Sequence, residues 1–161
     1  MPNWCQNKLK ISGSEKDVAA VKALILNERQ IVDFEVLLPV PSELVGYADI
    51  REWVMQEWGV KWNVGESYPL KEVEEDQVAW TFLTAWSAPT QWFHKVLNAV
   101  KALKGNNAEV TLEFVEVGMW FGGSMGIGSD GFAYENEWDD EQIETFIGSE
   151  DAENEGLSWS F

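Results

Sequence analysis

Residues 126–131 (Gly-Ile-Gly-Ser-Asp-Gly) have the spacing of the dinucleotide-binding pattern G-x-G-x-x-G. That chemistry needs the pattern in a turn between a strand and a helix, because the helix N-terminus holds the pyrophosphate. Here the following residues, Phe132 to Glu137, predict another strand, and the surrounding charge is negative. We therefore interpret the Gly122 to Gly131 segment as a flexible hairpin loop rather than a nucleotide site.

Carboxylates crowd the neighbouring segment, where Asp130, Glu135, Glu137, Asp139 and Asp140 lie close together in sequence. Calcium and magnesium ions prefer several such oxygens. The spacing of an EF-hand is absent, so the pattern is more typical of a solvated acidic face. We expect no metal and no cofactor.

The single histidine, His94, and the single cysteine, Cys5, are the remaining candidates for catalysis. A general base needs a nucleophile or an orienting carboxylate within hydrogen-bond reach, and nothing in the sequence brings His94 to Cys5. We interpret His94 as a residue at the boundary of a helix's apolar stripe and Cys5 as a small buried thiol. The sequence favours a non-enzymatic protein and leaves an enzyme open.

Ten tryptophans are several times the usual share for a chain of 161 residues. Each aromatic side chain buries about 150–250 Å², so we expect some of them at a binding surface rather than in the core. RNA-recognition modules stack bases on exposed aromatics, but they need basic surroundings, which this chain lacks. The interpretation that we favour is that the tryptophans of the excursion cover an open sheet face, and the alternative is a ligand groove formed by six residues. The six are Trp58, Lys61, Trp62, Thr84, Trp86 and Ser87.

The net charge of -17 is unevenly distributed along the chain. Residues 1–71 hold eight Lys or Arg against ten Asp or Glu, whereas residues 105–161 hold fourteen Asp or Glu and no Lys or Arg. Because nucleic-acid affinity comes largely from Lys and Arg, direct DNA or RNA binding is disfavoured and a basic protein partner is favoured. The predicted partner-binding residues are Glu135, Glu137, Asp139, Asp140, Glu141 and Glu144.

Apolar alternation and helical spacing predict two βαβ halves. Two such halves commonly give an α+β, ferredoxin-like antiparallel sheet with both helices on one face. The expected elements are a strand over 3–12, a helix over 15–28 capped by Ser14, a strand over 32–38, a strand over 78–86, a helix from Pro89 to Leu103 and a strand over 110–114.

One domain is expected over residues 1–149, with an inserted excursion over 42–76 and a C-terminal hairpin and helix over 119–148. Residues 150–161 are expected to be an acidic tail, whose alternating Leu157, Trp159 and Phe161 would dock as an edge strand. No export signal and no apolar run of membrane-spanning length is visible. The lone cysteine fits a reducing compartment, so we expect a cytoplasmic protein that makes no membrane contact.

Four blocks of sequence carry a family resemblance. They are residues 1–5 with Asn7, residues 58–62, residues 82–89, and residues 116–118 followed by Phe121 and Gly122. Over about residues 1–123 the chain resembles the YubB ferredoxin-like family, uncharacterised proteins of phages, plasmids and bacterial genomic islands. The resemblance implies a ferredoxin-like fold and a mobile-element origin, and it implies no activity and no functional residues.

Three functional hypotheses follow from these patterns. The first is a non-enzymatic acidic protein that binds a basic host protein, including a nucleic-acid-binding one whose basic groove accepts phosphate-like charge. The second is a small-ligand-binding or enzymatic module with an aromatic groove around Trp58, Trp62 and Trp86. The third is an assembly subunit whose tail, Leu157 to Phe161, pairs with a neighbour.

Overall fold

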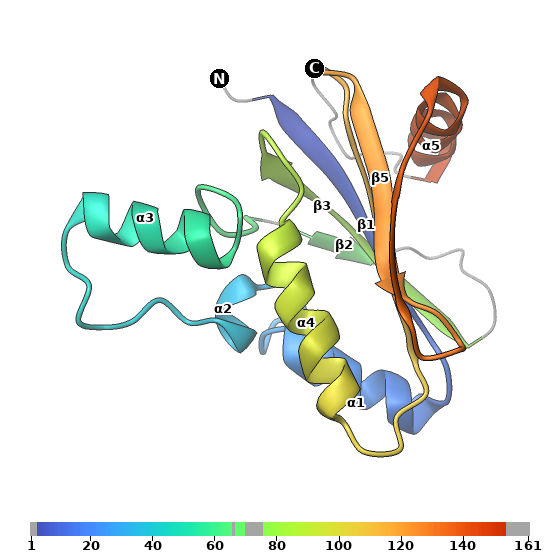
Figure 1. Cartoon of the computed structure of the whole chain (residues 1–161), viewed down its shortest axis with the longest axis horizontal. Coiled ribbons are helices and arrows are strands. Elements are labelled where there is room, and N and C mark those ends of the chain that lie inside the picture. The colour runs from blue at the N-terminus through green and yellow to red at the C-terminus, as the bar shows by residue number, and fades with distance from the viewer. Residues whose placement is uncertain (1–2, 66, 70–75, 154–161) are drawn as a thin grey trace.

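The structure, a computed structural model, describes residues 3–65, 67–69 and 76–153. These residues form an α+β protein with a six-stranded antiparallel sheet and five helices (Figure 1). In chain order the elements are β1 (Trp4–Ser12), α1 (Glu15–Ile25), α2 (Phe34–Leu37), α3 (Tyr47–Glu57), β2 (Ser67–Pro69), β3 (Gln77–Ala85), α4 (Thr90–Ala102), β4 (Glu109–Glu116), β5 (Phe121–Ile127), β6 (Ala133–Glu137) and α5 (Asp140–Glu153).

The strands are ordered β2-β3-β1-β4-β5-β6 across the sheet. The first four positions of this order fit a broadly ferredoxin-like arrangement. Strand β1 lies between β3 and β4, and Leu9 is opposite both Trp80 and Leu112. Since directly opposed residues share one face of a sheet, these three side chains point to the same layer.

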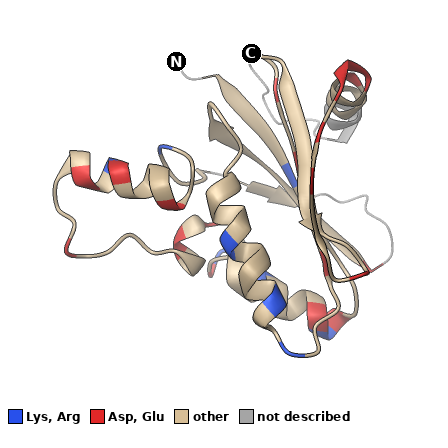
Figure 2. Ribbon diagram, in the orientation of Figure 1, with Lys and Arg blue, Asp and Glu red and all other residues tan. Residues whose placement is uncertain are grey.

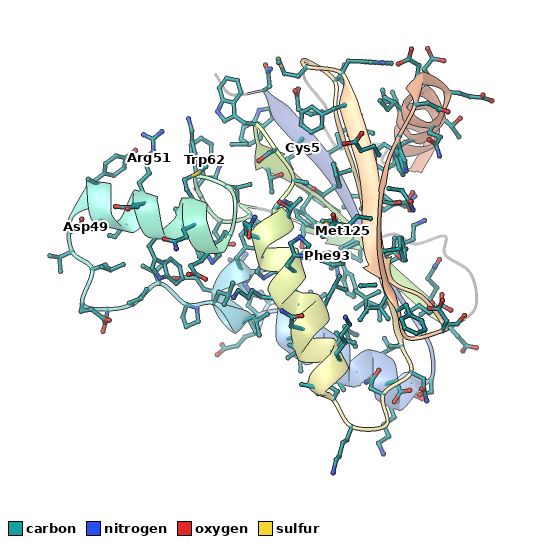
Figure 3. The ribbon with its side chains drawn as sticks, viewed as in Figure 1. Cys5, Asp49, Arg51, Trp62, Phe93 and Met125 are labelled. Carbon is teal, nitrogen blue, oxygen red and sulfur yellow. The ribbon has the colours of Figure 1, made fainter. Side chains whose placement is uncertain are left out.

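Helices α1 and α4 cover that face and form the main core with it (Figure 1). The apolar stripe of α4 is entirely buried, as its helical spacing predicts. Figure 3 shows Phe93 of α4 and Met125 of β5 in the layer between helix and sheet, and both residues belong to the core. The predicted helix from Pro89 is therefore confirmed, and so are the strands expected around residues 3–12, 78–86 and 110–114.

The prediction of a strand over residues 32–38 is wrong. Val32 makes only an isolated bridge to Leu26, and residues 34–37 form α2 instead. The cause is local, because the Asp33 carboxylate accepts the Glu35 N–H at 2.9 Å and caps a helix. Such side-chain bonds to nearby backbone compete with a strand ladder. The edge position beside β3 is taken by β2, which lies within the segment expected to be an excursion.

Helix α3 of the excursion and the neighbouring α2 extend the layer of α4. Trp58 packs against Phe34 and Trp53, with ring centroids 5.5 and 5.9 Å apart, and its carbonyl accepts the N–H of Trp92 at 3.3 Å. Figure 1 shows α3 projecting from the molecule on the α4 side of the sheet. The interpretation that excursion tryptophans cover the opposite, open face is therefore wrong for Trp58.

Helix α5 lies on the opposite face of the sheet (Figure 1). Its Ile143 and Phe146 form a second, smaller core with Val115 of β4. A Cβ atom on Gly122 would lie 2.8 Å from the carbonyl oxygen of Phe114 and 3.3 Å from Ile143. The glycine therefore lets strand and helix approach closely. Residues 122–127 consequently belong to β5 rather than to the loop expected there, and the hairpin turn to β6 follows them.

Helix α5 extends to Glu153, beyond the helix end expected at residue 148. The edge strand predicted for Leu157, Trp159 and Phe161 lies outside the described residues. Among the helices that the structure describes, none combines the length and the apolar character needed to cross a bilayer.

Candidate interaction surfaces

Four buried side chains with polar groups come together at one end of the sheet, on the face of α1 and α4. Cys5 is opposite Thr84 on one side and Glu116 on the other, and Asn7 follows two residues along β1. The Asn7 amide donates to Thr84 Oγ1 at 2.9 Å and to the Phe82 carbonyl at 3.3 Å. We call Cys5, Asn7, Thr84 and Glu116 the buried polar cluster, because each is at most 1% exposed.

The Glu116 carboxylate is satisfied by backbone donors in the turn after β4. One oxygen accepts the Gly118 N–H at 2.6 Å, and the other accepts the Met119 N–H at 2.8 Å. Burial, and then the nearby Glu116 carboxylate, raise the pKa of the Cys5 thiol well above its ordinary value. The thiol is therefore protonated at neutral pH and is not a nucleophile, in line with the expectation of a buried structural cysteine.

Exposed tryptophans surround this end of the sheet. Trp62 and Trp86 are 45% and 44% exposed, and the rings of Trp4 and Trp62 meet edge to face with centroids 6.2 Å apart. The Lys61 ammonium lies 5.4 Å from the centre of the Trp86 ring, within cation–π distance. We call Trp4, Lys61, Trp62 and Trp86 the tryptophan rim. Figure 3 shows Trp62 in the loop after α3.

Hydrogen bonds between distant segments hold the rim in place. The Trp86 N–H donates to the Asn3 carbonyl at 2.7 Å, and the Ser87 hydroxyl donates to the Gly59 carbonyl at 3.2 Å. The Thr84 hydroxyl donates to the Ser87 carbonyl at 2.6 Å. Trp86 has a φ of +71°, a left-handed conformation that is strained for a bulky residue. These contacts fix the strained residue with half of its ring in solvent.

The six residues predicted to bind a ligand are thus divided by the structure. Lys61, Trp62 and Trp86 belong to the rim, whereas Trp58 is 3% exposed and donates its indole N–H to the Leu38 carbonyl at 3.0 Å. The remaining two, Thr84 and Ser87, position the loops that carry the rim.

The six predicted partner-binding acids are all exposed and lie on β6 and on the start of α5. Figure 2 shows acidic residues without basic ones on these two elements, whereas α1 and α3 carry both charges. We call this set the acidic surface. It consists of Glu135, Glu137, Asp139, Asp140, Glu141 and Glu144.

Half of the acidic surface makes structural contacts. The Asp139 carboxylate caps α5 by accepting the Gln142 N–H at 2.9 Å, and Asp140 accepts the Trp120 indole N–H at 2.8 Å. Glu135 lies 3.0 Å from the His94 imidazole on α4, a salt bridge when the imidazole is protonated. The side chain that His94 contacts is therefore an acid of β6.

The other half makes no such contacts. In the described parts of the chain, the carboxylates of Glu137, Glu141 and Glu144 form no hydrogen bond or ion pair. Nor do the described residues include any group of three or more His, Cys, Asp or Glu arranged to hold a metal ion. These three acids carry charge that the fold does not use.

A groove of about 370 Å³ runs between α5 and the sheet. Lys8 and Lys10 of β1 line its floor, and Trp138, Glu141 and Phe146 line the α5 side. Lys10 forms an ion pair with Glu113 of β4, which also lines the groove. The cations on this face are therefore turned toward the groove, where the carboxylates of Glu113 and Glu141 also lie.

The four sequence blocks that resemble the YubB family meet at the tryptophan rim. Residues 3–5 begin β1, residues 58–62 follow α3, residues 82–89 end β3, and residues 116–118 end β4. Hydrogen bonds connect Asn3 to Trp86 and Gly59 to Ser87, and Cys5 is opposite Glu116. Sequence reasoning did not select Asn7 or Glu116 as site residues. The sequence feature that could have identified them is a polar residue at a strand position that faces the core.

These features define an α+β protein with a broadly ferredoxin-like strand order and two exposed surfaces of different chemistry. No family model matches the chain, and no curated protein or solved structure matches it. The assignment to the YubB family stays a prediction.

Proposed function

We propose that this protein is a non-enzymatic acidic interaction protein of phage or mobile-element origin whose acidic surface binds a basic host protein in the bacterial cytoplasm. A nucleic-acid-binding host protein fits best, because its basic groove already accepts a row of negative charges. The buried thiol of Cys5, whose pKa is raised by burial, argues against cysteine-based covalent catalysis.

One observation carries the proposal, namely the three acids of β6 and α5 that have no structural role. Exposed carboxylates of one sign, with no Lys or Arg after residue 104, create a negative potential that steers a cationic partner. A carboxylate that served only the fold would cap a helix, as Asp139 does, or pair with a cationic side chain, as Glu135 does with a protonated His94.

A second candidate function rests on the tryptophan rim. Two half-exposed indole rings offer an aromatic surface to a sugar ring or a peptide. Trp86 is held by a backbone hydrogen bond and lies under Lys61, and Trp62 packs against the ring of Trp4. Trp58 would support this surface from the core rather than touch the ligand. This second candidate function needs no basic partner, so an experiment can distinguish it from the first.

The test is affinity capture of the tagged protein from a bacterial host lysate at about 50 mM and about 500 mM salt, since screening shortens the reach of surface charge. We expect a basic protein to be captured at low salt and released at high salt. The triple variant Glu137→Gln, Glu141→Gln, Glu144→Gln is expected to lose most of this capture.

The matched control is Glu43→Gln, Asp49→Asn, Glu52→Gln, which removes the same charge from exposed positions around α3. If both variants capture the basic protein equally, net charge rather than the acidic surface is responsible. Capture of no basic protein by the parent at low salt would contradict the proposed function.

A further inference from the structure

We infer that the free edge of β6 binds an extended basic segment of the partner as an additional strand of the sheet. This inference rests on the proposed function and specifies how the acidic surface recognises its partner. The chemistry is β-strand addition, in which main-chain hydrogen bonds supply affinity and alternate side chains supply selectivity.

Within residues 3–65, 67–69 and 76–153, strand β6 is the last strand of the sheet and pairs only with β5. The Trp138 N–H donates to the Gly122 carbonyl at 3.0 Å, and the Gly128 N–H donates to the Phe132 carbonyl at 3.2 Å. Backbone groups alternate in direction along a strand, so the even-numbered residues of β6 turn theirs toward β5. The odd-numbered residues, Ala133, Glu135 and Glu137, therefore present their N–H and C=O groups outward.

These outward groups have no hydrogen-bond partner among the described residues. All three residues are also exposed. The other edge of the sheet is different, because β2 has three residues and ends at Pro69, which lacks an N–H. Of the two edges, β6 is the one that offers a longer row of donors and acceptors.

The side chains on this edge select the charge of the added strand. Glu135 is opposite Met125 of the core, so Glu135 and Glu137 lie on the α4 face of the sheet. In an added strand, the residues opposite them would share that face, where Lys or Arg is favourable and Asp or Glu is repelled. A second copy of β6 would place glutamates opposite glutamates, which disfavours pairing of this chain with itself.

The probe is a synthetic peptide, acetyl-Thr-Lys-Val-Lys-Val-Lys-Thr-amide, whose lysines all lie on one face when it is extended. Binding to the full chain is measured by calorimetry at low salt. Binding is also followed by the amide signals of Ala133, Glu135 and Glu137 in ¹⁵N-resolved NMR spectra. We expect binding that weakens with salt, and about three- to tenfold weaker binding to the Glu135→Gln, Glu137→Gln variant.

Two N-methylated peptides separate strand addition from simple charge attraction. One is methylated at the central lysine and the other at a flanking valine, so both keep the same charge and each loses one backbone N–H. In either strand orientation only one of these N–H groups faces β6. We expect about tenfold weaker binding for one methylated peptide and nearly unchanged binding for the other.

Equal binding by the two methylated peptides would overturn strand addition, while salt-dependent binding of the parent peptide would still support the proposed function. Absence of binding by the unmethylated peptide would also overturn strand addition. The proposed function itself falls only with the capture experiment, so the two failures are distinguishable.

Discussion

The end of the sheet near Cys5 and the edge formed by β6 and α5 use carboxylates in opposite ways. Glu116 is fully buried, and both of its oxygens accept backbone hydrogen bonds. Glu137, Glu141 and Glu144 are exposed and make no such bonds among the described residues. A buried carboxylate without partners would strongly destabilise the fold, whereas replacing an exposed carboxylate changes the free energy of unfolding very little.

The tryptophans are divided in the same manner. Trp58 fills the core between α2, α3 and α4, while Trp62 stands on the rim with nearly half of its surface in solvent. One residue type therefore serves the fold in one region and remains available in another. The groups that the fold does not use are therefore the candidates for function, and the tryptophan and glutamate variants change the same residue type in both regions.

The largest effect is expected from the tryptophan pair. Trp58→Ala should destabilise the protein by about 3–5 kcal/mol, because it removes a buried indole and leaves a cavity. Trp62→Ala should cost less than about 1 kcal/mol, since its ring is half in solvent. Urea unfolding followed by circular dichroism measures both free energies.

If Trp58→Ala does not fold, Trp58→Phe keeps the comparison, because a smaller cavity should cost about 1–3 kcal/mol. Equal losses of unfolding free energy for substitutions at positions 58 and 62 would contradict the assignment of Trp58 to the core and Trp62 to the rim. A stable Trp62→Ala protein would also be the reagent for asking whether the rim binds a ligand.

The second effect concerns the glutamates. Glu116→Ala should cost about 1–3 kcal/mol, because the Gly118 and Met119 N–H groups lose two part-buried hydrogen bonds to a carboxylate. Glu137→Ala should change stability by less than about 0.5 kcal/mol. Glu116→Gln, which keeps one acceptor oxygen, should fall between them in the same unfolding experiment.

A neutral result for Glu116→Ala would show that the turn after β4 can satisfy its own backbone groups. In that case the buried polar cluster would no longer be a structural requirement. A large loss for Glu137→Ala would instead reveal a role in the fold that its exposure does not suggest.

Sequence patterns predicted the elements whose periodicity reflects burial, such as β3 and the stripe of α4. They failed where a single side chain changed the local structure, as Asp33 does by capping α2. The glycines of β5 also led to the wrong prediction of a flexible loop. Glycine is required not only in such loops but also where a strand packs closely against neighbouring backbone, as here.

The candidate surfaces were predictable to different degrees. The acids were identified from charge alone, because exposure is the default for carboxylates. The tryptophans could not be divided into Trp58 and Trp62 beforehand, since they flank one glycine and differ only in tertiary contacts. Nor does a sequence show which edge of a sheet stays unpaired.

The smallest expected effect comes from Asp33, a carboxylate that is intermediate between the two regions. Burial raises its pKa, but hydrogen bonds from Asn63, the Glu35 N–H and Asn27 outweigh burial, so the pKa lies below its usual value. A carboxyl whose pKa is lower in the folded state adds stability above its unfolded pKa of about 4, and loses it as the pH falls further.

Because Asp33 is only partly buried and solvent screens its interactions, its contribution should stay below about 1 kcal/mol. Asp33→Asn keeps an acceptor for the cap of α2 and removes the titration. The unfolding free energy of this variant should therefore fall less steeply than that of the parent between about pH 4 and pH 2. Parallel pH profiles for the parent and Asp33→Asn would show instead that the hydrogen bonds at Asp33 do not depend on its charge.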